Sequence, residues 1–339
     1  MATIQTVCGA IPPSACGMTL AHEHLFIDMT NEAAVGAETR PVESGDFSRL
    51  LRDPYCMRDN LLVADEEVAL DECRDLATLG CKTVVDCSTA QIGRNPEALK
   101  RLSQLSGIQI VMGCGFYTGD TFPAETAEIP AERLAEGIVE ECQNGVDDTG
   151  IKPGVLGEFG TSREILPNEL RALEAAAIAH SRTGLPIQAH IYPWCTNGLD
   201  VAKFLMERKV SPERIVICHS DVSLDAAYIR ALLALGVFVE FDNFGKEFTP
   251  APGASFAGGN FAKDTERVSL LAELYREGYA RQLLATNDIC LKCMLRKFGG
   301  RGYAHVIRDI PPMLEKLGIP SNEWFAQVMC DNPMRLRSG

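Results

Sequence analysis

The chain has 339 residues, of which 46% are hydrophobic, a length that accommodates two ordinary domains or one large α/β barrel. Its formal net charge of −14 argues against a nucleic-acid or membrane-surface partner, because both bind through clustered Lys and Arg. The first residues lack a secretion signal, and no run of about 18 apolar residues could span a bilayer. We therefore expect a cytoplasmic protein that acts on a small molecule.

Thirteen cysteines are present, an odd number in a large chain. Cys87, Cys114 and Cys218 lie within apolar runs, where cysteine behaves as a small hydrophobic residue, so we expect reduced thiols rather than a disulfide framework. The one C-x-x-C pair, Cys290 and Cys293, has no second pair at zinc-site spacing. We interpret it as incidental.

Taken in chain order, the segment from residue 3 to residue 13 predicts a small antiparallel hairpin, and short apolar runs then alternate with longer helical patterns. The eight runs that predict strands are 18–24, 83–89, 108–117, 155–162, 186–191, 215–221, 238–245 and 283–288. Several of the intervening segments open with Asn, Asp or Pro and most close on Gly, as helices do. Strand followed by helix eight times predicts a closed parallel (β/α)8 barrel, the TIM-barrel fold, as a single domain over residues 1–339.

Two connections are too long for plain turns. The first runs from Met29 to about Leu62, and the second is the Gly-, Ala- and Pro-rich stretch that starts at Gly245. Both follow carboxyl ends of predicted strands, so we expect them to roof the active site and to contribute to substrate choice.

The first predicted strand contains two histidines that flank a glutamate. Alternate side chains of a strand share a face, so His22 and His24 point the same way while Glu23 points the opposite way. That spacing suits two ligands of one metal ion, although a His-x-His pair alone is weak evidence.

Other chemically unusual residues fall at corresponding places in the predicted barrel. Histidines or carboxylates lie in or at the ends of the strands, and the set comprises His22, His24, Glu158, His190, His219 and Asp288. A barrel brings the carboxyl ends of its strands to one rim, where catalytic residues gather. Imidazoles and carboxylates in this number suit two divalent cations with one carboxylate between them. The remaining histidines, His180 and His305, lack such a placement, and we interpret them as structural.

The motifs that surround these residues resemble the phosphotriesterase family of the amidohydrolase superfamily over almost the whole chain. The matching motifs are GMTLAHEHLFID, IGRNP, GVLGEFGTS, QAHIYP, ICHSD, ATNDICLK, FGGRGYAHV and NPMRL. The resemblance implies the same barrel and a pair of metal ions. It assigns the buried metal to His22, His24 and Asp288, and the more exposed metal to His190 and His219.

One position departs from the organophosphate-cleaving members, which bridge their metals with a carboxylated lysine on strand four. Here that strand reads VLGEFG and has no lysine, so Glu158 is similar to the bridge of the family's glutamate-bridged branch. This substitution puts organophosphate hydrolysis in doubt as the native reaction.

Two such cations lower the pKa of a shared water from its value in bulk water to about 7, so no side-chain nucleophile is required. We expect the bridging hydroxide to attack a carbonyl carbon, with Asp288 as the catalytic residue that takes the proton and passes it to the leaving group. Zinc is the expected metal, while manganese, iron and cobalt accept the same donors. Candidate substrate contacts at strand ends are Tyr117, Arg94, Trp194, Lys246 and Lys292. A basic cluster in an acidic chain suggests an anionic substrate.

We therefore predict a binuclear metal-dependent hydrolase of lactones or carboxylate esters, because the glutamate-bridged relatives include several such enzymes. Hydrolysis of an N-acyl amide with the same site is a close competitor, and organophosphate triester cleavage is a further alternative. A metal- or ligand-binding protein without turnover is the non-enzymatic alternative, and a homodimer is compatible with the family resemblance.

Overall fold

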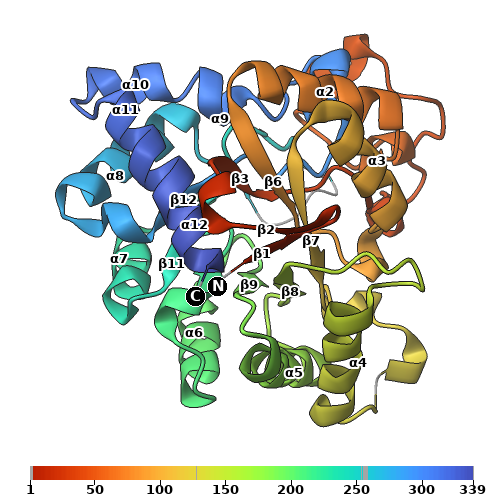
Figure 1. The fold of residues 1–339 in the computed structure, drawn as a ribbon. Helices are drawn as coiled ribbons and strands as arrows, with labels where there is room; N and C mark the ends of the chain where they lie inside the picture. Colours follow the sequence, from red (N-terminus) through yellow and green to blue (C-terminus); the bar gives the residue numbers. More distant parts are fainter. Residues whose placement is uncertain (1–2, 127, 253, 255–258, 339) are drawn as a thin grey trace.

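The computed structural model describes residues 3–126, 128–252, 254 and 259–338. Parallel strands lie side by side in chain order and curve into a barrel with helices outside it (Figure 1). The barrel strands are β3 (Met18–Glu23), β6 (Cys81–Asp86), β7 (Gln109–Cys114), β8 (Val155–Gly160), β9 (Ile187–His190), β10 (Ile215–Ile217), β11 (Phe238–Phe241) and β12 (Leu283–Ala285). The chain after β12 returns to β3, where the Thr286 hydroxyl donates to the His22 carbonyl at 2.9 Å. The TIM barrel predicted from the sequence is confirmed.

The helices that cover the barrel begin and end at residues suited to these positions. The longer ones are α2 (Glu66–Thr78), α3 (Pro96–Ser106), α4 (Ala131–Asn144), α5 (Pro167–Thr183), α6 (Gly198–Glu207), α7 (Ala226–Leu235) and α8 (Asp264–Arg276). The Asp65 carboxylate accepts the first free amides of α2, and Gly107 ends α3 at a φ of +78°, which a side chain would oppose. Among the described residues, no helix is both long enough and apolar enough to cross a bilayer.

Both ends of the chain lie at the same end of the barrel (Figure 1). The strands β1 (Ile4–Thr6) and β2 (Gly9–Ile11) form the predicted antiparallel hairpin, and Ile4 packs against Val85, Val111 and Val155. Leu336 of α12 (Asn332–Arg337) packs against further strand residues. These side chains fill the amino-terminal end of the barrel, which leaves the carboxyl-terminal rim for the functional site.

Short elements occupy the remaining connections. They are β4 (Ile27–Asp28), α1 (Phe47–Leu50), β5 (Leu62–Val63), α9 (His305–Arg308), α10 (Pro311–Lys316), α11 (Ser321–Trp324) and a π-helical stretch, Phe325–Asp331. Strands β4 and β5 pair in antiparallel fashion and tie together the two ends of the first long connection. Part of the second long connection, residues 253 and 255–258, lies outside the described residues.

Several strands end earlier than the apolar runs predict. Strand β6 ends at Asp86 rather than at residue 89, and β10 ends at Ile217 rather than at residue 221. The polar side chains that follow, including Ser88 and His219, therefore stand on short loops just beyond the strands. Backbone that has left the ladder can turn these side chains toward the barrel axis.

Candidate metal centre

The six candidate ligands converge at the carboxyl-terminal rim, with the Glu158 carboxylate among the imidazoles. Its Oε1 lies 3.4 Å from Nε2 of His24, and its Oε2 lies 3.4 Å from Nε2 of His22. The same Oε2 is 3.3 Å from Nδ1 of His190 and 3.7 Å from Nε2 of His219. All these side chains are buried, so the interactions occur away from bulk water.

Asp288 adds a second carboxylate that approaches three of the same histidines. Its Oδ1 lies 3.1 Å from Nε2 of His24 and 3.7 Å from Nε2 of His22. Its Oδ2 lies 3.7 Å from Nδ1 of His219 and contacts the Lys246 ammonium group. Asp288 therefore faces both the imidazoles and a buried cation from the chain itself.

Two of these residues have a backbone conformation that side chains oppose. His219 has a φ of +57° and Asp288 a φ of +48°. Non-glycine residues in this left-handed region are uncommon and cluster at functional sites, where the surrounding structure holds them. The conformation allows both side chains to turn back over the barrel mouth directly after their strands.

The electrostatic field of the site favours positive charge. Burial alone would lower the pKa of His24, but Asp288 and Glu158 outweigh burial and raise it to about 9. Burial likewise opposes protonation of His219, yet Asp242 and Glu158 raise its pKa to about 10. Burial disfavours the Glu158 carboxylate, but the neighbouring imidazoles hold its pKa well below the usual range.

The donor atoms fit divalent cations. Within the described chain, Nε2 of His22 and Oε2 of Glu158 are buried and have no hydrogen-bond partner, which is costly unless another group satisfies them. Two sets of donor atoms each lie within 4.8 Å of one another, namely His22, His24 and Glu158, and Glu158, His190 and His219. Glu158 belongs to both sets, so the arrangement suits two cations that share its carboxylate.

Polar groups behind the imidazoles fix the ring orientations. Nδ1 of His24 lies 2.9 Å from the Ser88 hydroxyl, and Nδ1 of His219 lies 3.1 Å from Oδ2 of Asp242. Such contacts to the far ring nitrogen set which nitrogen is free to bind a metal. In both rings Nε2 faces Glu158, and in His219 it also lies 2.8 Å from Nδ1 of His190.

A cavity of about 340 Å³ opens directly over these ligands. Tyr117, Trp194 and Lys246, three of the predicted substrate contacts, line it, and the Tyr117 ring packs 4.9 Å from the His190 ring. Both long connections also contribute to its wall, as predicted, through Tyr55 from the first and Phe261 from the second.

The structure does not bring the other two predicted substrate contacts, Arg94 and Lys292, to this cavity. The Arg94 side chain is 1% exposed and forms two hydrogen bonds of 3.0 Å with Glu141. Lys292 forms a 2.6 Å ion pair with Asp59. Each of these two basic side chains therefore pairs with a carboxylate that lies outside the cavity.

Sequence reasoning missed a different cation, Arg163, which lines the cavity on the loop after β8. Its guanidinium carbon stacks 4.6 Å from the centre of the Tyr192 ring, and it forms no ion pair with any carboxylate that the structure describes. Its position could have indicated this, because Arg163 lies only three residues beyond the end of β8, the strand that carries Glu158. Sequence reasoning also missed Asp242 and Glu240, which alternate on the otherwise apolar run FVEFD.

The remaining histidines and cysteines lie outside the ligand set. His180 bonds to the Leu185 carbonyl at 2.7 Å, and His305 bonds to Asp264 and Asp309 at 2.7 Å each. The thirteen cysteines are free thiols. Cys290 lines the cavity, while its neighbour in the C-x-x-C pair, Cys293, is buried elsewhere.

Comparison with known proteins agrees with this geometry. The model of the phosphotriesterase family matches residues 2–337. The chain belongs to the phosphotriesterase family. An N-acetyltaurine hydrolase from Danio rerio is 32% identical, with 98% of this chain and 97% of the relative covered.

Two solved structures superpose closely on this chain. A resiniferatoxin-binding protein from Rhodobacter sphaeroides has a TM-score of 0.95 at 32% identity, covering 99% of this chain and 95% of that one. A lactonase from Listeria monocytogenes has a TM-score of 0.80 at 25% identity, covering 99% of this chain and 98% of that one. The chain is therefore similar to proteins named for N-acetyltaurine hydrolysis, for lactone hydrolysis and for resiniferatoxin binding.

Proposed function

We propose that this protein is a binuclear metal-dependent hydrolase that cleaves the acyl–nitrogen bond of a small N-acyl amide with an anionic group. The observation that carries the proposal is the buried ring of imidazoles around Glu158, whose donor atoms form two sets that fit divalent cations. The N-acyl substrate is favoured over the lactone or ester predicted first, because curated relatives covered over nearly their full length are named N-acetyltaurine hydrolases.

The residues that would hold the cations are His22, His24 and Asp288 at one position and His190 and His219 at the other, with Glu158 common to both. When bound, two such cations would activate water at neutral pH and polarise a carbonyl oxygen. They would also compensate the charge of two buried carboxylates. Zinc is the default, and manganese, iron and cobalt suit the same donors.

The chain's own groups would handle the proton and the substrate. In amide hydrolysis, water adds its oxygen to the acyl carbon, the carbon–nitrogen bond breaks, and the amine leaves with a proton from that water. Asp288 borders the cavity, and its carboxylate would hold this proton before the nitrogen takes it. Tyr117, whose pKa burial and the charge of Glu158 raise, would stay protonated and donate to the acyl oxygen.

Arg163 supports an anionic substrate. The Lys246 ammonium group is engaged by Asp288. Among the described residues that line the cavity, the Arg163 guanidinium is then the cation that would receive a carboxylate or sulfonate. The aromatic rings of Tyr192, Trp194 and Phe261 beside it would pack against the apolar part of the substrate.

Kinetic comparison of acyl compounds tests this proposal. The purified protein, supplied with zinc or manganese, is assayed with N-acetyltaurine, with a neutral N-acetyl amine of similar size, and with a lactone and an ester panel. We expect the highest kcat/KM with the anionic amide, and loss of turnover on chelation. Arg163→Ala should raise KM for the anionic amide about 10- to 100-fold, as loss of a charged hydrogen bond predicts, and leave the neutral amide unchanged.

Arg101→Ala is the matched control, because Arg101 is an exposed arginine that pairs with Glu66 outside the cavity. Higher kcat/KM for lactones or esters would favour the second candidate, which the similarity to the Listeria lactonase supports. Two bound metals without hydrolysis of any of these compounds would contradict an enzymatic role and favour ligand binding.

A further inference from the structure

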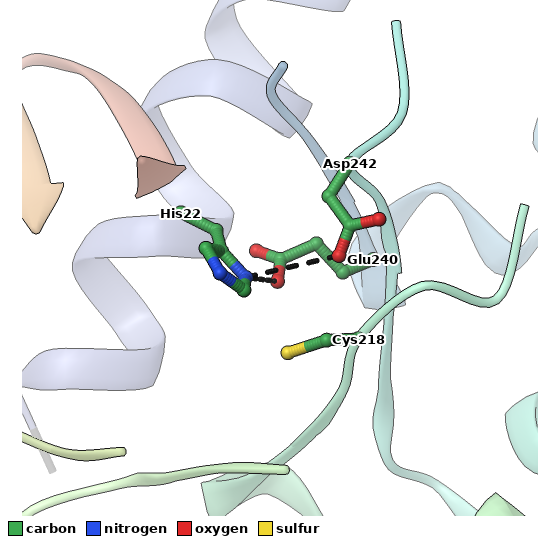
Figure 2. A group of neighbouring side chains, drawn as sticks. All are labelled: His22, Cys218, Glu240 and Asp242. Atoms are coloured by element: carbon green, nitrogen blue, oxygen red, sulfur yellow. Dashed lines mark hydrogen bonds and ion pairs between the residues drawn. The ribbon is translucent and has the colours of Figure 1, made fainter. Parts of the chain in front are cut away.

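A second group of buried donors lies on the far side of the His22 ring. Cys218, Glu240 and Asp242 surround its Nδ1, and the donor atoms of the four residues lie within 4.8 Å of one another (Figure 2). Oε2 of Glu240 is 3.0 Å from this nitrogen and Oδ2 of Asp242 is 3.7 Å from it. All four side chains are fully buried, so no bulk water competes for these contacts.

The two carboxylates of this group have different partners. Asp242 serves His219, because its Oδ2 accepts the His219 backbone amide at 2.8 Å and lies 3.1 Å from Nδ1 of that ring. Glu240 serves His22, and its other oxygen has no hydrogen-bond partner among the residues that the structure describes. Figure 2 shows the carboxylate of Glu240 aimed at the His22 ring.

The two nitrogens of His22 therefore face two different carboxylates. Nε2 points to Glu158 in the candidate metal centre, and Nδ1 points to Glu240 behind it. A neutral imidazole carries one N–H, and a carboxylate that accepts this hydrogen at Nδ1 leaves the lone pair at Nε2 for a cation. The hydrogen bond to the carboxylate also makes the ring more basic, so Nε2 binds a metal ion more strongly.

We propose that Glu240 is a positioning residue for the buried cation, holding His22 in the tautomer and orientation in which Nε2 binds metal. The inference rests on the proposed metal centre and adds a residue that neither the sequence motifs nor the ligand set includes. We assign this role to Glu240 because Asp242, the other carboxylate near Nδ1, already accepts the backbone amide of His219 and contacts its ring.

Metal titration of the purified protein tests the role of Glu240. Metal-free wild type, Glu240→Gln and Glu240→Ala are titrated with Zn²⁺, and stoichiometry and Kd are measured. Wild type should bind two cations per chain. Glu240→Gln, which keeps an acceptor but loses the charge, should weaken one of the two by about 10-fold, and Glu240→Ala by about 100-fold. The second cation should keep its wild-type Kd.

Glu169→Gln is the matched control, since Glu169 is also buried and accepts backbone amides, but away from the ligand atoms. It should bind both cations as wild type does. Cadmium-113 NMR of the cadmium-loaded proteins gives a readout that loss of stability alone would not move. One of two resonances should shift in Glu240→Gln, and neither in Glu169→Gln. Thermal unfolding of each metal-free variant establishes that it is folded, and Glu240→Gln suffices if Glu240→Ala does not fold.

Three outcomes would overturn the inference and are distinguishable. If wild type and Glu240→Gln bind two cations with the same Kd, Glu240 has no positioning role while the proposed centre stands. If wild type binds three cations and Glu240→Gln two, the four residues of Figure 2 are themselves a metal site. If wild type binds none, the proposed function fails and the inference fails with it.

Discussion

Glu23, which separates the two strand histidines in sequence, ties the end of β12 to β3. Its Oε1 accepts hydrogen bonds from the Thr286 hydroxyl at 2.6 Å and from the backbone and side-chain nitrogens of Asn287 at 2.9 Å each. Its Oε2 accepts from the Ile289 amide at 2.9 Å. These partners flank Asp288 on both sides, so Glu23 fixes the backbone from which this candidate ligand projects.

Replacing Glu23 with Gln keeps the size of the side chain but changes its hydrogen bonding. The amide oxygen of Gln can accept the three hydrogen bonds that Oε1 of Glu23 accepts. The NH2 group of Gln then takes the place of Oε2 and faces the Ile289 amide, so one charged hydrogen bond worth about 1.5 to 3 kcal/mol is lost. The three that remain become neutral and weaken by about 1 kcal/mol each. Part of this loss is returned, because burial raises the pKa of Glu23 and Gln carries no charge to desolvate. We expect a net loss of about 2 to 4 kcal/mol in the free energy of unfolding.

Urea denaturation of the metal-free protein measures that loss, and zinc titration measures its consequence at Asp288. Glu23→Gln should also lower the affinity for one cation by about 10-fold, since it removes a carboxylate that fixes the backbone on both sides of Asp288. Glu169→Gln is again the control, because Glu169 accepts amides and a hydroxyl in the same manner. It should lose comparable stability with unchanged metal affinity. A loss below about 1 kcal/mol for Glu23→Gln, or unchanged metal affinity, would refute this reasoning.

Three other features lead to expected outcomes. Arg94→Met should lower the free energy of unfolding by about 2 kcal/mol, because it leaves the partly buried Glu141 carboxylate without its arginine partner. It should leave KM unchanged, and a raised KM would contradict the position of Arg94 outside the cavity. Because the pKa of His24 is raised to about 9 and that of His219 to about 10, cation binding at pH 8 must release protons. Apparent zinc affinity should therefore fall as pH is lowered and rise up to about pH 10, and calorimetry in buffers of different ionisation enthalpy should detect the protons; affinity independent of pH would count against it. Tyr117→Phe should lower kcat about 100- to 1,000-fold with metal content unchanged, as loss of one donor to the acyl oxygen predicts, and an unchanged kcat would contradict a role for Tyr117 in the chemistry.

The convergence of the candidate ligands could be predicted from the sequence because two independent regularities coincide. Strand alternation places His22 and His24 on one face, and a parallel barrel places every carboxyl strand end on one rim. A histidine or a carboxylate at such an end has few directions in which to point. The buried position of Glu158 followed from the same regularity, since the surrounding strand is apolar on both sides.

The substrate contacts were harder to predict because long basic side chains have many possible partners. Arg94 and Lys292 both follow strands, as Lys246 does, yet Glu141 and Asp59 lie within reach of the first two. Which partner such a side chain finds depends on helix and loop packing that periodicity does not encode. The role of Glu240 could not be predicted for a different reason, because it depends on Nδ1 of His22, more than 200 positions earlier in the chain.

Metal content tests the central claim of a binuclear centre most directly. Protein purified without added metal, then dialysed against zinc or manganese, is measured by elemental analysis beside Glu158→Ala, in which the shared carboxylate is removed. We predict about two cations per chain for the wild type and one or fewer for the variant. Wild-type protein that stays metal-free in the presence of both ions, or a variant that binds both cations as tightly as wild type, would contradict the account.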